Sequence, residues 1–138
     1  MSKKYELTDE TVRINSIILH RIKALTDFGD VDAGDLGGWV ESERNLSHDG
    51  NAWVGGDAWV YGDAQVYGDA QVCGNAWVGG NAWVYGDARV CGNARVCGNA
   101  RVYGNARVDG NARVGGNAWV YDNAQVYGDA WVYGDARV

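Results

Sequence analysis

The chain has 138 residues, no proline and a net charge of −6, and its length fits a single domain. No apolar stretch is long enough to cross a bilayer, and Met1 to Tyr5 lack the apolar segment of a secretory signal, so we expect a cytoplasmic protein that does not contact membranes. Residues 51–138 carry six Arg and eight Asp, and this balance argues against non-specific binding of nucleic acid.

Residues 1–26 are expected to form a cap built from a β-hairpin. Lys4–Leu7 and Ile17–Leu25 have the composition of strands, and Val12–Ile14 followed by the Asn15-Ser16 turn predicts a hairpin. The second strand should place Ile18, His20, Ile22 and Ala24 on one face and Ile17, Leu19, Arg21 and Lys23 on the other. The more apolar face needs a cover, which the repeats that follow can supply.

Residues 27–50 are predicted to form a degenerate first coil ahead of the regular repeats. Asn45 to Gly50 keep the turn of a repeat unit but place His48 where the unit has Val. We therefore expect His48 to be a polar substitute at the edge of the core, and His20 to be a residue of the cap.

Residues 51–138 repeat a six-residue unit of the type Asn/Asp-Ala-x-Val-x-Gly fourteen times and begin a fifteenth. Ala and Val lie two positions apart, so on a strand both point to one side, and the Gly-Asn or Gly-Asp pair predicts a corner. Burying one Ala and one Val gives roughly 2 to 4 kcal/mol, whereas ordering six residues costs on the order of 1 to 2 kcal/mol each. Single units cannot fold alone, so the repeats should stack as a solenoid with an Ala and Val core.

The order of residues in Val54 to Trp59 resembles the hexapeptide repeat of left-handed parallel β-helices, in which three units make a triangular coil of 18 residues. Ile22 to Val31, with Gly37-Gly38-Trp39-Val40, further resembles the opening of YdcK-like β-solenoid proteins, many of them encoded by phages or prophages. The resemblance implies an all-β, left-handed parallel β-helix with an N-terminal hairpin cap, in the cytoplasm of a bacterial host cell.

Coils of 18 residues would align the outward third and fifth positions of the units in columns. These columns contain aromatic rings and guanidinium groups, which either stabilise the coils by stacking or form a docking surface. The candidate binding surface consists of Trp59, Trp77, Trp83, Trp119, Trp131, Tyr67, Tyr85, Tyr103, Tyr121, Arg89, Arg95, Arg101, Arg107 and Arg113. The five arginines fall in consecutive units and would form a belt around the rod rather than one cleft.

The corner and cysteine residues should stack in the same way. Asn75, Asn93, Asn111 and Asp129 predict a structural ladder rather than a calcium site. Cys73 and Cys91 would lie on neighbouring coils, close enough for a disulfide under oxidation, although an odd number of cysteines favours ordinary reduced thiols.

Residues for catalysis are scarce. Acyltransferases of the left-handed β-helix fold use a histidine base near an extruded loop, and carbonic anhydrases of that fold use three histidines, whereas this chain has two. Residues 51–138 contain no serine or threonine and no interrupted unit. We therefore predict that the chain is not an enzyme and uses no cofactor and no metal.

The sequence is compatible with three functions. The first is a non-enzymatic scaffold or protein-binding rod that associates with a protein partner, and with itself through the C-terminal coil, where nothing in the sequence predicts a cap; that coil could instead fray, or the chain could be shortened. The second is a phage counter-defence protein that sequesters a host signalling nucleotide or blocks a host immune protein. The third and weakest is a relic acyltransferase.

Overall fold

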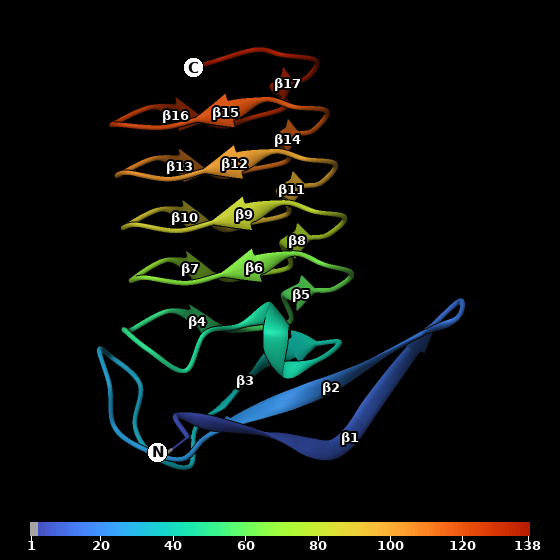
Figure 1. Cartoon of the computed structure of the whole chain (residues 1–138), viewed down its shortest axis with the longest axis vertical. Helices are drawn as coiled ribbons and strands as arrows, with labels where there is room; N and C mark the ends of the chain where they lie inside the picture. The colour runs from blue at the N-terminus through green and yellow to red at the C-terminus, as the bar shows by residue number, and fades with distance from the viewer. Residues whose placement is uncertain (1–2) are drawn as a thin grey trace.

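The structure is a computed structural model that describes residues 3–138. Met1 and Ser2, which begin both the predicted cap and the segment expected to lack a secretory signal, lie outside the described residues. The chain forms a hairpin followed by a stack of coils, and the N-terminal hairpin lies at one end of the stack (Figure 1). Within residues 3–138, no helix is long and apolar enough to span a membrane.

The cap is an antiparallel pair of strands, β1 (Tyr5–Ile14) and β2 (Ile17–Ala24), joined at Asn15, whose φ is 54°. The hairpin prediction is confirmed, but β1 is one long strand with an irregularity between Leu7 and Thr11. The predicted face of β2 is wrong in part. Ile18 is 47% exposed, while Leu19 and Ile22 are both buried. The pairing of β2 with β3 shifts register between Arg21 and Lys23, and such a shift changes which side chains face inward.

Each six-residue unit contributes a two-residue strand, and Gly and Asn or Asp form the corner. In the strands an outward residue precedes a buried Val, as the repeat predicts, except in β17, where Val132 is partly buried. After β3 (Leu36–Val40) and a 3-10 turn, η1 (Glu43–Asn45), these strands are β4 (Trp53–Val54), β5 (Trp59–Val60), β6 (Gln65–Val66), β7 (Gln71–Val72), β8 (Trp77–Val78), β9 (Trp83–Val84), β10 (Arg89–Val90), β11 (Arg95–Val96), β12 (Arg101–Val102), β13 (Arg107–Val108), β14 (Arg113–Val114), β15 (Trp119–Val120), β16 (Gln125–Val126) and β17 (Trp131–Val132).

The strands align in three parallel sheets, which are the faces of the solenoid. The order is β5-β8-β11-β14-β17 on the first face, which β1, β2 and β3 extend, β4-β7-β10-β13-β16 on the second, and β6-β9-β12-β15 on the third. Paired residues are 18 positions apart, for example Arg95 with Trp77 and Arg113. In Figure 1 the near strands of the third face run leftward while the chain climbs, so the coil is left-handed. The predicted all-β, left-handed solenoid is confirmed.

The core is one continuous column of Ala and Val. Every Ala and Val from Ala52 to Val120 has an exposed fraction of 0 or 1%. Backbone N–H groups donate to the coil above, as from Trp77 N to Ala94 O at 2.9 Å and from Gly79 N to Val96 O at 2.9 Å. Each coil therefore depends on its neighbours for both burial and hydrogen bonds, as the energetics of a single unit require.

The first coil departs from the predicted register. Trp39 and Val40 of β3 pair with Trp59 and Val60, and Leu46 pairs with Val66, so the spacing is 20 residues up to Leu46. By Trp53, which pairs with Gln71, the spacing is 18. Two additional residues are therefore accommodated between Leu46 and Trp53, in the segment that contains His48. The prediction that His48 replaces Val is wrong, because Leu46 occupies that core position and is fully buried.

Two residues, Lys4 just before β1 and Tyr5 at its start, close the lower end of the core. Tyr5 is fully buried, and its hydroxyl donates to Leu46 O at 2.6 Å. The Lys4 ammonium donates to Ala52 O at 2.6 Å, an acceptor that a further coil would otherwise satisfy. Desolvation by burial lowers the pKa of Lys4 to about 8, although Asp49 and Asp69 act in the opposite direction. In the cap, the Tyr5 ring thus covers the end of the core, and the Lys4 ammonium replaces the backbone N–H of a further coil as the donor to Ala52 O.

Cys73 and Cys91 form a disulfide between β7 and β10 coils, with Cα atoms 4.6 Å apart. The stacking predicted for them is confirmed, but the expectation of reduced thiols is wrong for this pair. Cys97 is a free thiol of intermediate exposure. Two successive coils are therefore linked covalently.

Candidate functional site

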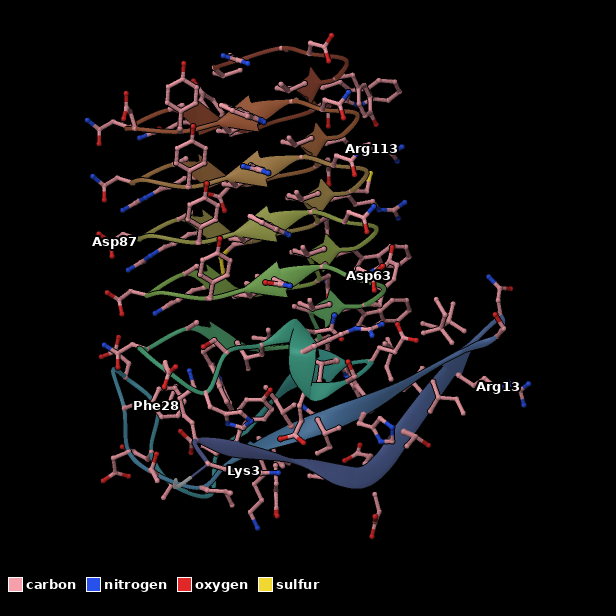
Figure 2. All side chains as sticks on the ribbon, viewed as in Figure 1. Lys3, Arg13, Phe28, Asp63, Asp87 and Arg113 are labelled. Carbon is pink, nitrogen blue, oxygen red and sulfur yellow. A yellow bond between two sulfur atoms is a disulfide. The ribbon has the colours of Figure 1, made fainter. Side chains whose placement is uncertain are left out.

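The third face carries a continuous column of tyrosine rings, which we call the tyrosine face. Tyr67, Tyr85, Tyr103 and Tyr121 stack with ring centroids 4.9, 5.0 and 5.4 Å apart and interplanar angles of 11° or less. Side chains rise one above another along the coils in Figure 2. Trp83 and Trp119 meet this column edge-on, at 6.2 to 6.5 Å. The column predicted from the 18-residue spacing therefore exists as one ordered surface.

Guanidinium groups cover the indole faces. Arg101 lies between Trp83 and Trp119, with its Cζ 4.5 and 5.6 Å from the ring centres. On the first face, Arg95 covers Trp77 at 4.2 Å, and Trp77 stacks on Trp59 at 4.6 Å. Arg113 covers Trp131 at 5.4 Å, and Trp131 is 64% exposed. These contacts are the cation–π pairs expected from the columns.

The predicted surface residues do not form a single site. Arg89 and Arg107 pair with each other on the second face, Arg95 and Arg113 on the first, and Arg101 on the third. The five arginines therefore surround the solenoid as the belt predicted from their consecutive units. The Asn ladder also exists, with amide contacts of 3.4, 3.2 and 3.1 Å from Asn75 through Asn93 and Asn111 to Asp129.

The first face contains a column that the sequence reasoning missed, with Tyr61, Gly79, Cys97, Gly115 and Tyr133 in successive coils. A cavity of about 200 Å³, which we call the Cys97 pocket, is lined by Tyr61, Trp77, Arg95, Val96, Cys97, Arg113 and Tyr133. The signal in the sequence was glycine at the fifth position of two units, where most units carry a larger side chain. Glycine there leaves space into which a neighbouring tyrosine can fold.

A second hollow lies where the cap meets the coils, and it contains His48. The cavity of about 380 Å³ is lined by Glu43, Arg44, Leu46, Ser47, His48, Gln65, Val66 and Tyr67. His48 Nδ1 accepts the Lys4 backbone N–H at 3.2 Å, and Nε2 lies 2.9 Å from Glu43 Oε1. The hydrogen bond with His48 holds the pKa of the Glu43 carboxyl below its usual range, although partial burial opposes this shift. The His48 ring also stacks on Tyr5, with centroids 4.2 Å apart.

A third cavity separates the hairpin tip from the first face. It has a volume of about 190 Å³ and is lined by Ile14, Asn15, Ile17, Leu19, Trp59, Tyr61 and Trp77. The hairpin therefore shields the indoles of the lower coils on this face. The third face, which carries the tyrosines, has no such cover from the hairpin in Figure 1.

Stacked 18-residue coils with ladders of like side chains define the protein as a parallel β-solenoid. The family model described as YdcK Beta solenoid repeat matches residues 64–80, 70–86, 88–110, 100–116, 112–128 and 124–138, together more than half of the chain. The chain belongs to this YdcK β-solenoid family.

One relative carries a name that bears on activity. The chain is 35% identical over 60 residues to the Escherichia coli (strain K12) protein named "Uncharacterized acetyltransferase YdcK". The match covers 38% of this chain and 18% of that relative, so the chain spans less than a fifth of the relative's length. This similarity to a protein named as an acetyltransferase contradicts the prediction that the chain is not an enzyme.

Proposed function

We propose that the chain is a rigid binding scaffold that docks a protein partner on its tyrosine face. The observation that carries the proposal is the unbroken column of four tyrosines, flanked by Trp83, Trp119 and Arg101. Tyr, Trp and Arg are the side chains that contribute most often to binding energy at protein interfaces. Their concentration on one flat face supports docking there.

The packing of the column favours a protein over an intercalating base. Each phenol ring is already stacked on its neighbours at 4.9 to 5.4 Å, which leaves ring edges and hydroxyl groups toward the solvent. Side chains held in this way lose little rotamer freedom on binding, so less of the interaction energy is offset by ordering. The small-nucleotide ligand predicted from the sequence remains a prediction, which calorimetry with cyclic dinucleotides would test.

The test compares two surface variants in quantitative affinity capture. Tyr85→Ser/Tyr103→Ser changes the tyrosine face, and Arg89→Gln/Arg107→Gln changes an equal number of residues on the second face. A partner that docks as proposed is captured by the wild type and the second-face variant and lost from the tyrosine-face variant, and the purified pair repeats this pattern. Equal capture by all three proteins would refute the proposal. A captured host immune protein would support the counter-defence role that the resemblance to phage-encoded proteins suggests.

Self-association through the C-terminal coil is a separate proposal. Tyr127 and Trp131 are 68% and 64% exposed there, and large exposed rings favour a contact between copies. Light scattering should give a mass above that of one chain, and Trp131→Gln should lower it. A monomeric wild type would contradict this proposal.

Acyl transfer is a second candidate, favoured by the name of the Escherichia coli relative. The residue that would act as base is His48, which lies beside Glu43 in the 380 Å³ hollow at the end of the coils. Because Nδ1 accepts a backbone N–H, the ring proton lies on Nε2 beside Glu43, so His48 could accept a substrate proton only after Nδ1 loses the Lys4 N–H or Nε2 passes its proton to Glu43. Incubation with acetyl-coenzyme A and primary amines tests this candidate; thiol release that persists in His48→Ala would exclude that residue as the base.

A further inference from the structure

The Cys97 pocket is built by two columns that run side by side on the first face. One column contains Trp77, Arg95, Arg113 and Trp131, on the successive strands β8, β11, β14 and β17. The other contains Tyr61, Gly79, Cys97, Gly115 and Tyr133, two positions further along the same coils. Both columns place an aromatic ring at each end and arginine or cysteine in the centre.

Two glycines allow the tyrosines to close on the thiol from opposite ends. A Cβ at Gly79 would lie 2.5 Å from ring atoms of Tyr61, and a Cβ at Gly115 would overlap the ring of Tyr133. The same position at Gly115 is 3.5 Å from Cys97 Sγ, so Gly115 lies between the Tyr133 ring and the thiol, which both line the cavity. The result is a walled hollow of about 200 Å³, whereas the tyrosines of the third face stack directly on one another.

The pocket has two positive charges, and the residues that line it include no carboxylate. Arg95 and Arg113 are directly paired on β11 and β14, so their like charges repel. None of the ion pairs found within residues 3–138 includes either guanidinium. A like-charged pair without a counter-charge is a site that an anion would stabilise.

The corner residues reinforce this charge pattern. The corners that flank β8, β11 and β14 are all asparagine: Asn75, Asn81, Asn93, Asn99, Asn111 and Asn117. The flanking coils of the same face instead carry aspartate, at positions 57, 63, 129 and 135. Two amide ladders connect these asparagines, with Asn93 Nδ2 to Asn111 Oδ1 at 3.2 Å and Asn99 Nδ2 to Asn117 Oδ1 at 3.1 Å. The asparagine corners beside Arg95 and Arg113 therefore carry no negative charge that would neutralise the two guanidinium groups.

We propose that the Cys97 pocket binds a small oxyanion, a phosphate or carboxylate group, between Arg95 and Arg113, with the two tyrosines as its walls. Guanidinium groups bind both anions through paired N–H donors. The Tyr61 phenol is protonated near neutral pH, as any tyrosine is, and can donate to the same anion; burial raises its pKa further. The cavity of about 200 Å³ also leaves room for a few atoms attached to the anionic group.

The free thiol of Cys97 provides a direct test, because it reports the local field through its rate of alkylation. The ratio of the rate with iodoacetate, an anion, to the rate with neutral iodoacetamide should fall roughly tenfold in Arg95→Gln/Arg113→Gln. The matched control, Arg89→Gln/Arg107→Gln, removes an equivalent arginine pair from the second face and should leave the ratio unchanged. Glutamine is the natural residue at this position in Gln65, Gln71 and Gln125, so both variants should fold.

Anion binding itself is tested by protection of the thiol. Inorganic phosphate, compared with chloride at equal ionic strength, should slow alkylation of Cys97 by iodoacetamide in the wild type and not in Arg95→Gln/Arg113→Gln. Acetate in a parallel series distinguishes the two anions: protection by phosphate alone assigns a phosphate site, and protection by acetate assigns a carboxylate site. Equal rate ratios in the wild type and the pocket variant, or no protection by either anion, would overturn the proposal.

Discussion

Glycine at the corners provides a quantitative test of how the coils stack. Gly74 has φ +64°, and a Cβ added there would lie 2.9 Å from both Gly92 N and Gly92 O, in the coil above. Gly128 has a closely similar φ of +66°, but an added Cβ would contact nothing within 4 Å. Alanine at either position costs about 1 to 2 kcal/mol for the left-handed backbone. Only Gly74→Ala should additionally separate two coils, at a cost of about 1 to 3 kcal/mol.

The measurement is urea unfolding followed by tryptophan fluorescence. Gly74→Ala is expected to lower the free energy of unfolding by about 3 kcal/mol, and Gly128→Ala by about 1 kcal/mol. Circular dichroism would establish that both variants keep their strands. If the two variants lose the same free energy within about 0.5 kcal/mol, then backbone contact between residues 74 and 92 does not limit the side chain at this corner, and the argument from stacking is wrong.

Three further predictions concern the corners, the cap and the disulfide. Asp122 has φ 54° at a corner where most units have glycine, so Asp122→Gly should raise the unfolding free energy by about 1 kcal/mol, and a lower unfolding midpoint would contradict this. Burial lowers the pKa of Lys4 to about 8, so between pH 8 and its unfolded-state value of 10.5 the folded chain binds fewer protons and stability should rise with pH. Lys4→Met should flatten that rise in urea titrations at pH 7 and 9.5; an unchanged slope would exclude Lys4 as its source. Reduction of Cys73–Cys91, which closes a loop of 18 residues, should lower stability by about 3 kcal/mol, and equal midpoints with and without reductant would show that the bond contributes nothing.

The regular coils could be predicted because their period determines both burial and pairing. Ala94 and Val96 lie two positions apart and point inward together, and a unit this small cannot fold without its neighbours. The same period placed Tyr67, Tyr85 and Tyr103 over one another, and the structure stacks them. These outcomes follow from local sequence and from geometry that every unit repeats.

The core residues and contacts of the first coil and the cap could not be predicted as accurately as those of the regular coils. Counting the six-residue register through this segment assigns the core position to His48; the pairing of Leu46 with Val66, made possible by two additional residues in the turn, assigns it to Leu46. The capping roles of Lys4 and Tyr5 depend on acceptors at Ala52 and Leu46, more than 40 positions away. Contacts of this range have no signature in a single sequence.

The Cys97 pocket could be predicted from the sequence only in part. Its columns follow from the 18-residue spacing, so Tyr61, Gly79 and Cys97 could have been aligned from the sequence. What the spacing does not give is the direction in which Tyr61 and Tyr133 fold, because that depends on the space left by glycine in the next coil. The cavity itself could therefore be identified only from the positions of the side chains in the structure.

Disulfide formation between engineered cysteines tests the 18-residue stacking most directly. In a chain whose three natural cysteines are replaced by serine, Arg107→Cys/Gln125→Cys places thiols on the paired positions of β13 and β16. Arg107→Cys/Trp119→Cys places them 12 positions apart, on different faces. We predict that mild oxidation closes the first pair within one chain and leaves the second pair open. Closure of the second pair, or equal closure of both, would contradict the stacked coils on which the account depends.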